Sequence, residues 1–168
     1  LTIADFGCGS GCIAVALAKN LFNSKVFAFD KSDEALEQTK ANAAHNDVEV
    51  EVIKVDMTDA LELNEQFDII VSNPPYVREC EKTQMKANVL DYEPHMALFV
   101  PNENPLVFYQ HIASIAQSSL KTGGKLYLEI NEALGEETEV IFKNLGYKTE
   151  IRKDFRDKYR MLFATKEF

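Results

Sequence analysis

Short apolar runs alternate with longer amphipathic stretches along the 168 residues of this chain. The apolar runs predict seven strands, at residues 1–6, 25–30, 48–55, 67–72, 125–130, 147–153 and 159–165. Apolar stripes at helical spacing predict helices at residues 12–22, 33–46, 105–122 and 134–145, with Gly123 and Gly124 ending the third. This alternation is typical of an α/β domain with a mainly parallel sheet and helices on both of its faces.

Two segments depart from the regular pattern. Residues 154–158 form a charged turn that is too short for a crossover, so the last strand should run antiparallel to its neighbour. Residues 73–104 show neither the apolar runs of a strand nor the apolar spacing of a helix, and this predicts a long irregular connection. When such a connection lies beside a site it is often a lid or a substrate clamp, and we expect this for residues 77–104.

Composition narrows the classes of function. The chain has 27 acidic and 18 basic residues, and its net charge of −9 disfavours broad binding to a nucleic-acid backbone. No apolar run approaches the roughly 20 residues of a membrane-spanning helix. The cysteines Cys8, Cys12 and Cys80 lack the spacing of a metal site and suit the reducing cytoplasm, where we expect the protein to reside.

A glycine-rich loop follows the first predicted strand, at the end where open α/β sheets bind their ligands. Its sequence, DFGCGSG, places glycines where the backbone must turn sharply or approach a ligand closely. A dinucleotide fingerprint would need glycine at position 12, which is Cys12. The loop instead resembles motif I of class I S-adenosylmethionine-dependent methyltransferases, although glycines for a tight turn alone are the alternative. The cofactor-binding candidates in this loop are Asp5, Gly7, Cys8, Gly9, Ser10 and Gly11.

Two further strands end in a carboxylate. Asp30 ends the second strand, where it can accept hydrogen bonds from both ribose hydroxyls of a nucleoside lying over the sheet. A capping or solvated role is the alternative. Asp56 and Met57 follow the third strand, and the resemblance implies that the acid meets the adenine amino group while the methionine packs on the ring. Asp56 could also merely begin a turn with Thr58 and Asp59.

The tetrapeptide Asn73-Pro74-Pro75-Tyr76 directly follows the strand at 67–72. It resembles the motif of methyltransferases that act on planar nitrogens, although a rigid turn is the plain alternative. Such a nitrogen is a poor nucleophile, and Asn73 Oδ1 and the Pro74 carbonyl can accept its two N–H groups, orient it and stabilise the charge that develops. Tyr76 offers a flat wall for the substrate. We predict Asn73, Pro74 and Tyr76 as catalytic, Pro75 as a further substrate contact, and Asn73 as a cofactor contact too.

Longer motifs make the resemblance more specific. The tetrapeptide, the segment Val89-Leu-Asp-Tyr-Glu-Pro94 and the run Leu126-Tyr-Leu-Glu-Ile130 together look like the HemK (PrmC) family. Its members are protein-(glutamine-N5) methyltransferases that modify the Gly-Gly-Gln motif of peptide-chain release factors. The resemblance implies a class I Rossmann-like fold, S-adenosylmethionine as cofactor with S-adenosylhomocysteine as product, no metal, and a release factor as partner. Asn131 is a departure, because the family usually has glycine there.

The resemblance also bears on domain organisation. Residues 1–168 correspond to the catalytic domain, and the N-terminal helical domain of the family is absent, so we expect a piece of a longer protein. Methylation of adenine N6 in DNA or RNA is the second hypothesis, which the acidity disfavours. A cofactor- or partner-binding protein without catalysis is the third, although both motifs are intact. Glu129, at a strand edge, is left outside the predicted site.

Overall fold

A computed structural model describes residues 1–59, 61, 63–84 and 95–168 of the chain. Its strands are β1 Thr2–Phe6, β2 Lys25–Asp30, β3 Glu51–Lys54, β4 Phe67–Ser72, β5 Val77–Arg78, β6 Phe99–Val100, β7 Leu120–Glu129, β8 Tyr147–Lys153 and β9 Tyr159–Lys166. Its helices are α1 Cys12–Asn20, α2 Asp33–His45, α4 His95–Leu98, α5 Val107–Ser119 and α6 Gly135–Asn144, with 3₁₀ turns η1 Glu79–Gln84 and η2 Glu132–Leu134.

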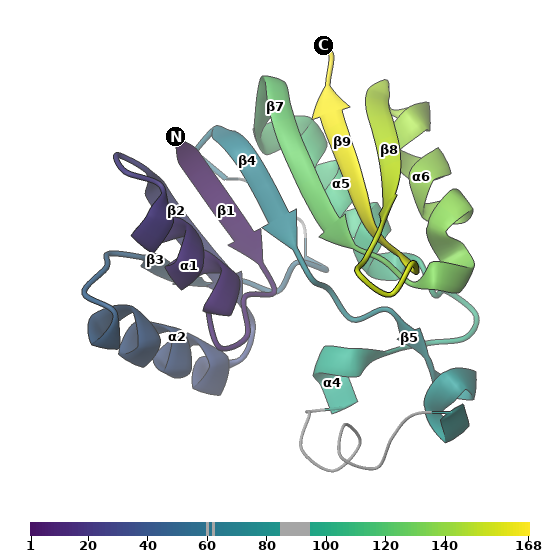
Figure 1. Cartoon of the computed structure of the whole chain (residues 1–168), viewed down its shortest axis with the longest axis horizontal. Coiled ribbons are helices and arrows are strands. Elements are labelled where there is room, and N and C mark those ends of the chain that lie inside the picture. The colour runs from purple at the N-terminus through teal and green to yellow at the C-terminus, as the bar shows by residue number, and fades with distance from the viewer. Residues whose placement is uncertain (60, 62, 85–94) are drawn as a thin grey trace.

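Seven strands form one sheet in the order β3-β2-β1-β4-β7-β9-β8 (Figure 1). The pairs from β3 to β7 are all parallel, while β9 lies between β7 and β8 and is antiparallel to both. The short turn after β8 can only return the chain alongside the strand that it leaves. The predicted seven-stranded, mainly parallel sheet with an antiparallel last strand is confirmed.

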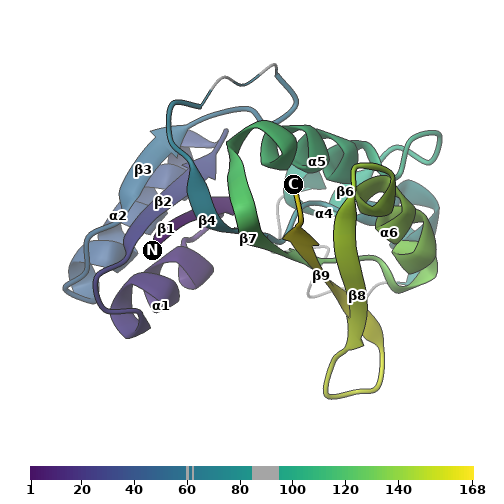
Figure 2. The same ribbon diagram turned by 90° about the horizontal axis from the view of Figure 1, so that it is seen from above.

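Helices cover both faces of the sheet, as expected. Helices α1 and α2 pack on one face beneath β1, β2 and β3, whereas α5 and α6 pack on the other face along β7, β8 and β9 (Figure 2). The side chain of Ser32 caps α2 by accepting a hydrogen bond of 3.3 Å from the Ala35 N–H. The small parallel pair of β5 and β6 lies with η1 and α4 beyond the carboxyl ends of β1 and β4 (Figure 1).

Some expected boundaries are wrong, chiefly around Gly123 and Gly124. Helix α5 ends at Ser119, and β7 begins at Leu120 and continues through both glycines. The register between β4 and β7 shifts between Leu120 and Lys125, and Gly123 takes a φ of +77° that residues with a Cβ rarely adopt. The two glycines therefore serve a bulge within a strand rather than the end of a helix.

The segment expected to be irregular is partly ordered. Within residues 73–104 the structure contains β5, β6, η1 and α4, and α5 begins at Val107, two residues after Pro105. Strand β3 is shorter than the expected range of 48–55 because its ladder with β2 covers only Glu51–Lys54.

Aromatic rings fill the core on the face covered by α5. The rings of Phe6 and Phe29 stack at 4.6 Å between centroids, and Phe67 meets Phe27 edge-on at 5.6 Å. Each of these four side chains is at most 2% exposed. Three neighbouring strands, β1, β2 and β4, thus contribute interlocking rings to the core.

We expect Phe67→Ala to lower the free energy of unfolding by about 3–5 kcal/mol, because it leaves a cavity among aromatic rings that pack from neighbouring strands. Phe22→Ala is the matched control, since Phe22 is 92% exposed, and it should change that free energy by less than about 0.5 kcal/mol. Urea denaturation of both variants measures the two values. Equal effects at the two positions would contradict this account of the core.

Candidate active site

The register of the parallel strands gathers the predicted site residues at one edge of the sheet. Phe6 of β1 pairs with Phe29 of β2 and with Ser72 of β4. Ser72 in turn pairs with Leu128 of β7. The residues that follow this row, namely Gly7, Asp30, Asn73 and Glu129, therefore emerge side by side at the carboxyl ends of four strands.

The glycine loop adopts a conformation that explains its composition. Gly7, Gly9 and Gly11 have φ values of +70°, +54° and +76°, in the left-handed region. A Cβ on Gly11 would lie 2.6 Å from the Thr39 side chain, so the close approach of α2 also requires glycine there. A Cβ on Gly9 would meet no atom of the described residues within 4 Å, so its backbone faces open space.

Helix α2 holds this loop through two polar side chains that the sequence analysis did not select. The Thr39 hydroxyl donates to the carbonyl oxygen of Gly9 at 3.0 Å, and the Asn42 amide donates to that of Ser10 at 2.8 Å. The two residues lie three apart and so share one helix face. Two polar residues three apart on the helix after the second strand are the signal by which the sequence could have indicated this role.

Cys8, in the same loop, is 9% exposed and contacts Thr39. Burial raises the pKa of its thiol to about 11, so the thiol stays neutral.

Asp30 ties the loop to the start of α2. One carboxylate oxygen accepts the Gly9 N–H at 2.9 Å, and the other accepts the Ser32 N–H at 3.0 Å. A carboxylate has about four acceptor positions, so two remain for a ligand. The expected role in binding ribose stays a prediction, and the structure adds an anchoring role.

Asp56 makes the turn that the sequence analysis offered as an alternative. Its Oδ1 accepts hydrogen bonds from the Thr58 N–H at 3.0 Å and the Thr58 hydroxyl at 2.7 Å, and these bonds lower the pKa of the carboxyl. Its Oδ2 lies 3.8 Å from the Lys31 ammonium. Met57 reaches the glycine loop, because its Cε would lie 3.3 Å from a Cβ on Gly7. Both residues are therefore brought to the edge that carries the loop.

Asp5 is fully buried behind the loop. Its Oδ2 accepts the Ala14 N–H of α1 at 3.1 Å, and its Oδ1 has no hydrogen-bond partner in the part of the chain that the structure describes. Burial raises the pKa of the carboxyl to about 7, and the negative charge of Asp30 contributes in the same direction. A neutral and a charged form of Asp5 are thus both accessible near neutral pH.

The tetrapeptide that follows β4 presents one polar side chain to solvent. Asn73 is exposed, Pro74 is buried, and Pro75 and Tyr76 are half-buried. The Tyr76 hydroxyl donates to Glu129 Oε1 at 2.5 Å. Burial and this bond to an anionic acceptor raise the pKa of Tyr76, so its hydroxyl stays protonated. Glu129 is therefore a residue of this site that the sequence analysis omitted.

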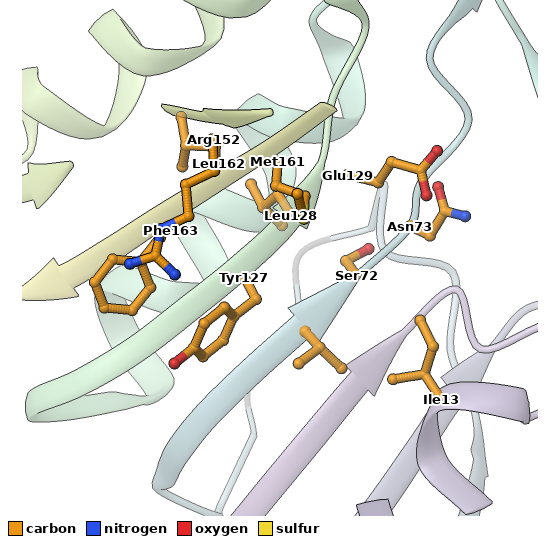
Figure 3. A pocket seen from close by; sticks show the side chains of 11 residues that line it. Ile13, Ser72, Asn73, Tyr127, Leu128, Glu129, Arg152, Met161, Leu162 and Phe163 are labelled. Carbon is orange, nitrogen blue, oxygen red and sulfur yellow. The ribbon is translucent and has the colours of Figure 1, made fainter. Parts of the chain in front are cut away.

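A pocket of about 240 Å³ opens beside Asn73 and Glu129 (Figure 3). It lies over the ends of β4 and β7 and extends along β9, with Ile13 of α1 on one side and Phe163 and Arg152 on the other. Most of its lining is apolar, while Asn73 and Glu129 lie next to each other at one end. Such a surface suits an uncharged group that is held at one polar point.

Some sequence expectations fall outside this description. Residues 85–94, which include Tyr92 and Glu93 of the family motif, lie outside the described residues, so the expected lid or clamp stays a prediction. Across residues 1–59, 61, 63–84 and 95–168 the structure contains no group of three or more His, Cys, Asp or Glu side chains able to hold a metal ion. None of the described helices is long and apolar enough to cross a membrane.

Comparison with known proteins agrees with this geometry. Residues 1–92 match the family model described as methyltransferase small domain. The chain is 48% identical over 163 residues to a release factor glutamine methyltransferase of Flavobacterium psychrophilum, covering 96% of this chain and 57% of that protein. It is 47% identical over 166 residues to one of Bacteroides thetaiotaomicron, covering 98% of this chain and 60% of that protein. The chain thus spans less than two thirds of the length of these relatives.

Solved structures share the fold at lower identity. A methyltransferase from Pyrococcus furiosus superposes with a TM-score of 0.72 at 21% identity, covering 99% of this chain and 75% of that chain. A 16S rRNA methyltransferase from T. thermophilus in complex with AdoMet and guanosine superposes with a TM-score of 0.66 at 20% identity, covering 98% of this chain and 37% of that chain. The class I methyltransferase fold predicted from the sequence is confirmed.

Burial of Asp5 leads to a pH-dependent stability. The pKa of its carboxyl is about 7 in the fold against an ordinary value of 3.8, so the folded chain keeps a proton that the unfolded chain has lost. The free energy of unfolding should therefore fall as pH rises from about 4 to about 7 and then level off. Asp5→Asn removes this titration and keeps an oxygen for the Ala14 N–H, so its stability relative to the parent should rise by up to about 1.4 kcal/mol per pH unit in that range.

Urea denaturation of the parent and Asp5→Asn at about pH 4.5, 6 and 7.5 measures this difference. Titrating groups that do not interact with Asp5 contribute equally to both proteins and cancel. A difference that does not change with pH would show that Asp5 ionises normally in the folded chain.

Proposed function

The chain belongs to the methyltransferase small domain family, and on that premise we propose that residues 1–168 are the catalytic domain of a protein-(glutamine-N5) methyltransferase that modifies the Gly-Gly-Gln motif of peptide-chain release factors. The observation that carries the proposal is the placement of exposed Asn73 beside the glycine loop, at one edge of the sheet and at the mouth of an apolar pocket. The names of the relatives at 47–48% identity support the choice of substrate.

The residues at this edge fit S-adenosylmethionine. Gly7, Gly9 and Gly11 take left-handed φ values, and at Gly9 the backbone faces open space, so a ligand can approach it closely. Asp30 retains acceptor positions for ribose hydroxyls, while Asp56 and Met57 border the expected adenine position. When bound, S-adenosylmethionine supplies an electrophilic methyl group and leaves as S-adenosylhomocysteine. No metal is part of this proposal.

The tetrapeptide supplies the acceptors that the reaction needs. Asn73 Oδ1 and the Pro74 carbonyl accept the two N–H groups of the glutamine amide and so direct its nitrogen. The same acceptors stabilise the positive charge that develops on that nitrogen during alkylation. The ring of Tyr76 packs against the planar amide, and the alkylated nitrogen becomes acidic enough to lose its proton without a strong base.

The direct test supplies labelled S-adenosylmethionine to the whole protein that contains this chain, together with a release factor, duplex DNA or RNA in separate reactions. We expect label on the Gly-Gly-Gln glutamine of the release factor and none on nucleic acid. A release factor with that glutamine replaced by alanine is the control. Label on adenine, with none on the release factor, would instead support the N6-adenine alternative.

Two variants separate catalysis from cofactor binding. Asn73→Ala should lower kcat by about 100-fold or more, because it removes an acceptor for the developing charge, while the cofactor Kd changes by less than about threefold. Asp30→Ala should raise the cofactor Kd by about tenfold or more, because it removes a charged acceptor. Steady-state kinetics and calorimetry measure these quantities. Retained turnover in Asn73→Ala would refute the acceptor role.

A further inference from the structure

The turn that carries the catalytic tetrapeptide is held at Tyr76 from two directions. The Tyr76 hydroxyl donates to Glu129 Oε1 at 2.5 Å, and the Asn131 side-chain amide donates to the Tyr76 carbonyl oxygen at 3.0 Å. Glu129 is the last residue of β7 and Asn131 lies two residues beyond it, so both partners are more than 50 residues further along the chain. The segment at the end of β7 thus fixes both the side chain and the backbone of Tyr76.

The second of these anchors is itself fully constrained. Asn131 is 6% exposed, and its second amide hydrogen is donated to Glu81 Oε2 at 3.0 Å. Its Oδ1 accepts the Ala133 N–H at 2.9 Å. Both hydrogens and the oxygen of the amide are therefore used, which determines the orientation of the side chain.

Glu81 links this anchor to the segment that follows the tetrapeptide. Its carboxylate accepts the backbone N–H of Arg78 at 2.9 Å and the Arg78 guanidinium at 3.1 Å. Tyr109, buried in the core, donates its hydroxyl to the Glu129 backbone carbonyl at 3.1 Å and fixes that end of β7. The network therefore reaches from the core to β5 through the anchors of Tyr76.

From this network we propose that Glu129 and Asn131 are positioning residues for methyl transfer, which act by fixing Tyr76 and, through the two prolines, the direction in which Asn73 presents its amide. The inference rests on the proposed function. Proline restricts the backbone on its N-terminal side, so an orientation set at Tyr76 is transmitted to Asn73. Glu129 also lines the same pocket as Asn73 (Figure 3).

The assignment gives Tyr76 a definite role. Because its hydroxyl is donated to Glu129, its ring is the part that meets the substrate amide. Glu129 contacts this hydroxyl rather than replacing Asn73 as acceptor. Loss of the contact should therefore misalign the amide nitrogen and lower kcat, with little change in cofactor affinity, because misplacement of a reacting group by a small distance slows transfer strongly.

A double-mutant cycle tests the Tyr76–Glu129 contact in the whole protein, with a release factor as substrate. Tyr76→Phe and Glu129→Ala should each lower kcat by about tenfold or more, and the double variant should be no slower than the slower single variant, since all three lack the same bond. Glu129→Gln keeps an acceptor and should recover most of the activity. Cofactor Kd should stay within about twofold of the parent throughout.

Tyr159→Phe and Glu65→Ala are the matched controls, because both residues are exposed and neither lines the pocket. They should leave kcat unchanged. Multiplicative losses in the double variant, or no recovery in Glu129→Gln, would overturn the proposal, because the two side chains would then act independently or through charge alone.

Hydrogen exchange tests the network without any substrate. The Arg78 amide donates to Glu81, which Asn131 holds, so Asn131→Ala should raise the exchange rate of this amide by about tenfold, while Asn20→Ala, on the exposed end of α1, should not. Unchanged protection would overturn the proposed role of Asn131. A parent that methylates no release factor would instead refute the proposed function, and the exchange result would still decide whether the network holds the turn.

Discussion

Parallel pairing of β1 with both β2 and β4 is the constraint on which the site depends. Because Phe6 pairs with Phe29 on one side and with Ser72 on the other, the next residue of each strand reaches the same edge. The aromatic rings of this row and of Phe27 and Phe67 next to it lock the register, since a shift by one residue would turn each ring to the opposite face. The glycine loop, Asp30 and Asn73 are therefore neighbours at this edge, as the proposed site requires.

Irregular backbone at this edge is held by side chains from elsewhere in the chain. Thr39 and Asn42 of α2 bind carbonyl groups of the glycine loop, and Asn131 binds the carbonyl of Tyr76. The backbone polar groups of a loop have no neighbouring strand to form hydrogen bonds with, so side-chain amides and hydroxyls form these hydrogen bonds instead. The site is thus preorganised by helix α2 on one side and by the end of β7 on the other.

Carboxylates are concentrated where the proposed cofactor would bind. Asp30 ends β2, Asp56 follows β3, and Asp5 lies one residue before the end of β1, where burial and also the charge of Asp30 raise its pKa. A cofactor with a positive sulfonium centre would reduce the repulsion between these groups. The net charge of −9 thus has a local counterpart at the site, which agrees better with a cationic small molecule and a protein substrate than with a polyanion.

Local sequence determined much of this protein. Apolar runs located β2, β4 and β8 at their observed bounds, and helical spacing placed the start of α2 at Asp33. The glycine loop and Asn73 were selected by motif. These signals act over a few residues, because hydrophobic period and turn chemistry are local. Tertiary structure alone decided the rest. The bond from Tyr76 to Glu129 joins residues 53 apart, and Gly123 serves a bulge only because β7 pairs with β4. Such contacts depend on strand order and register, which no short stretch of sequence encodes.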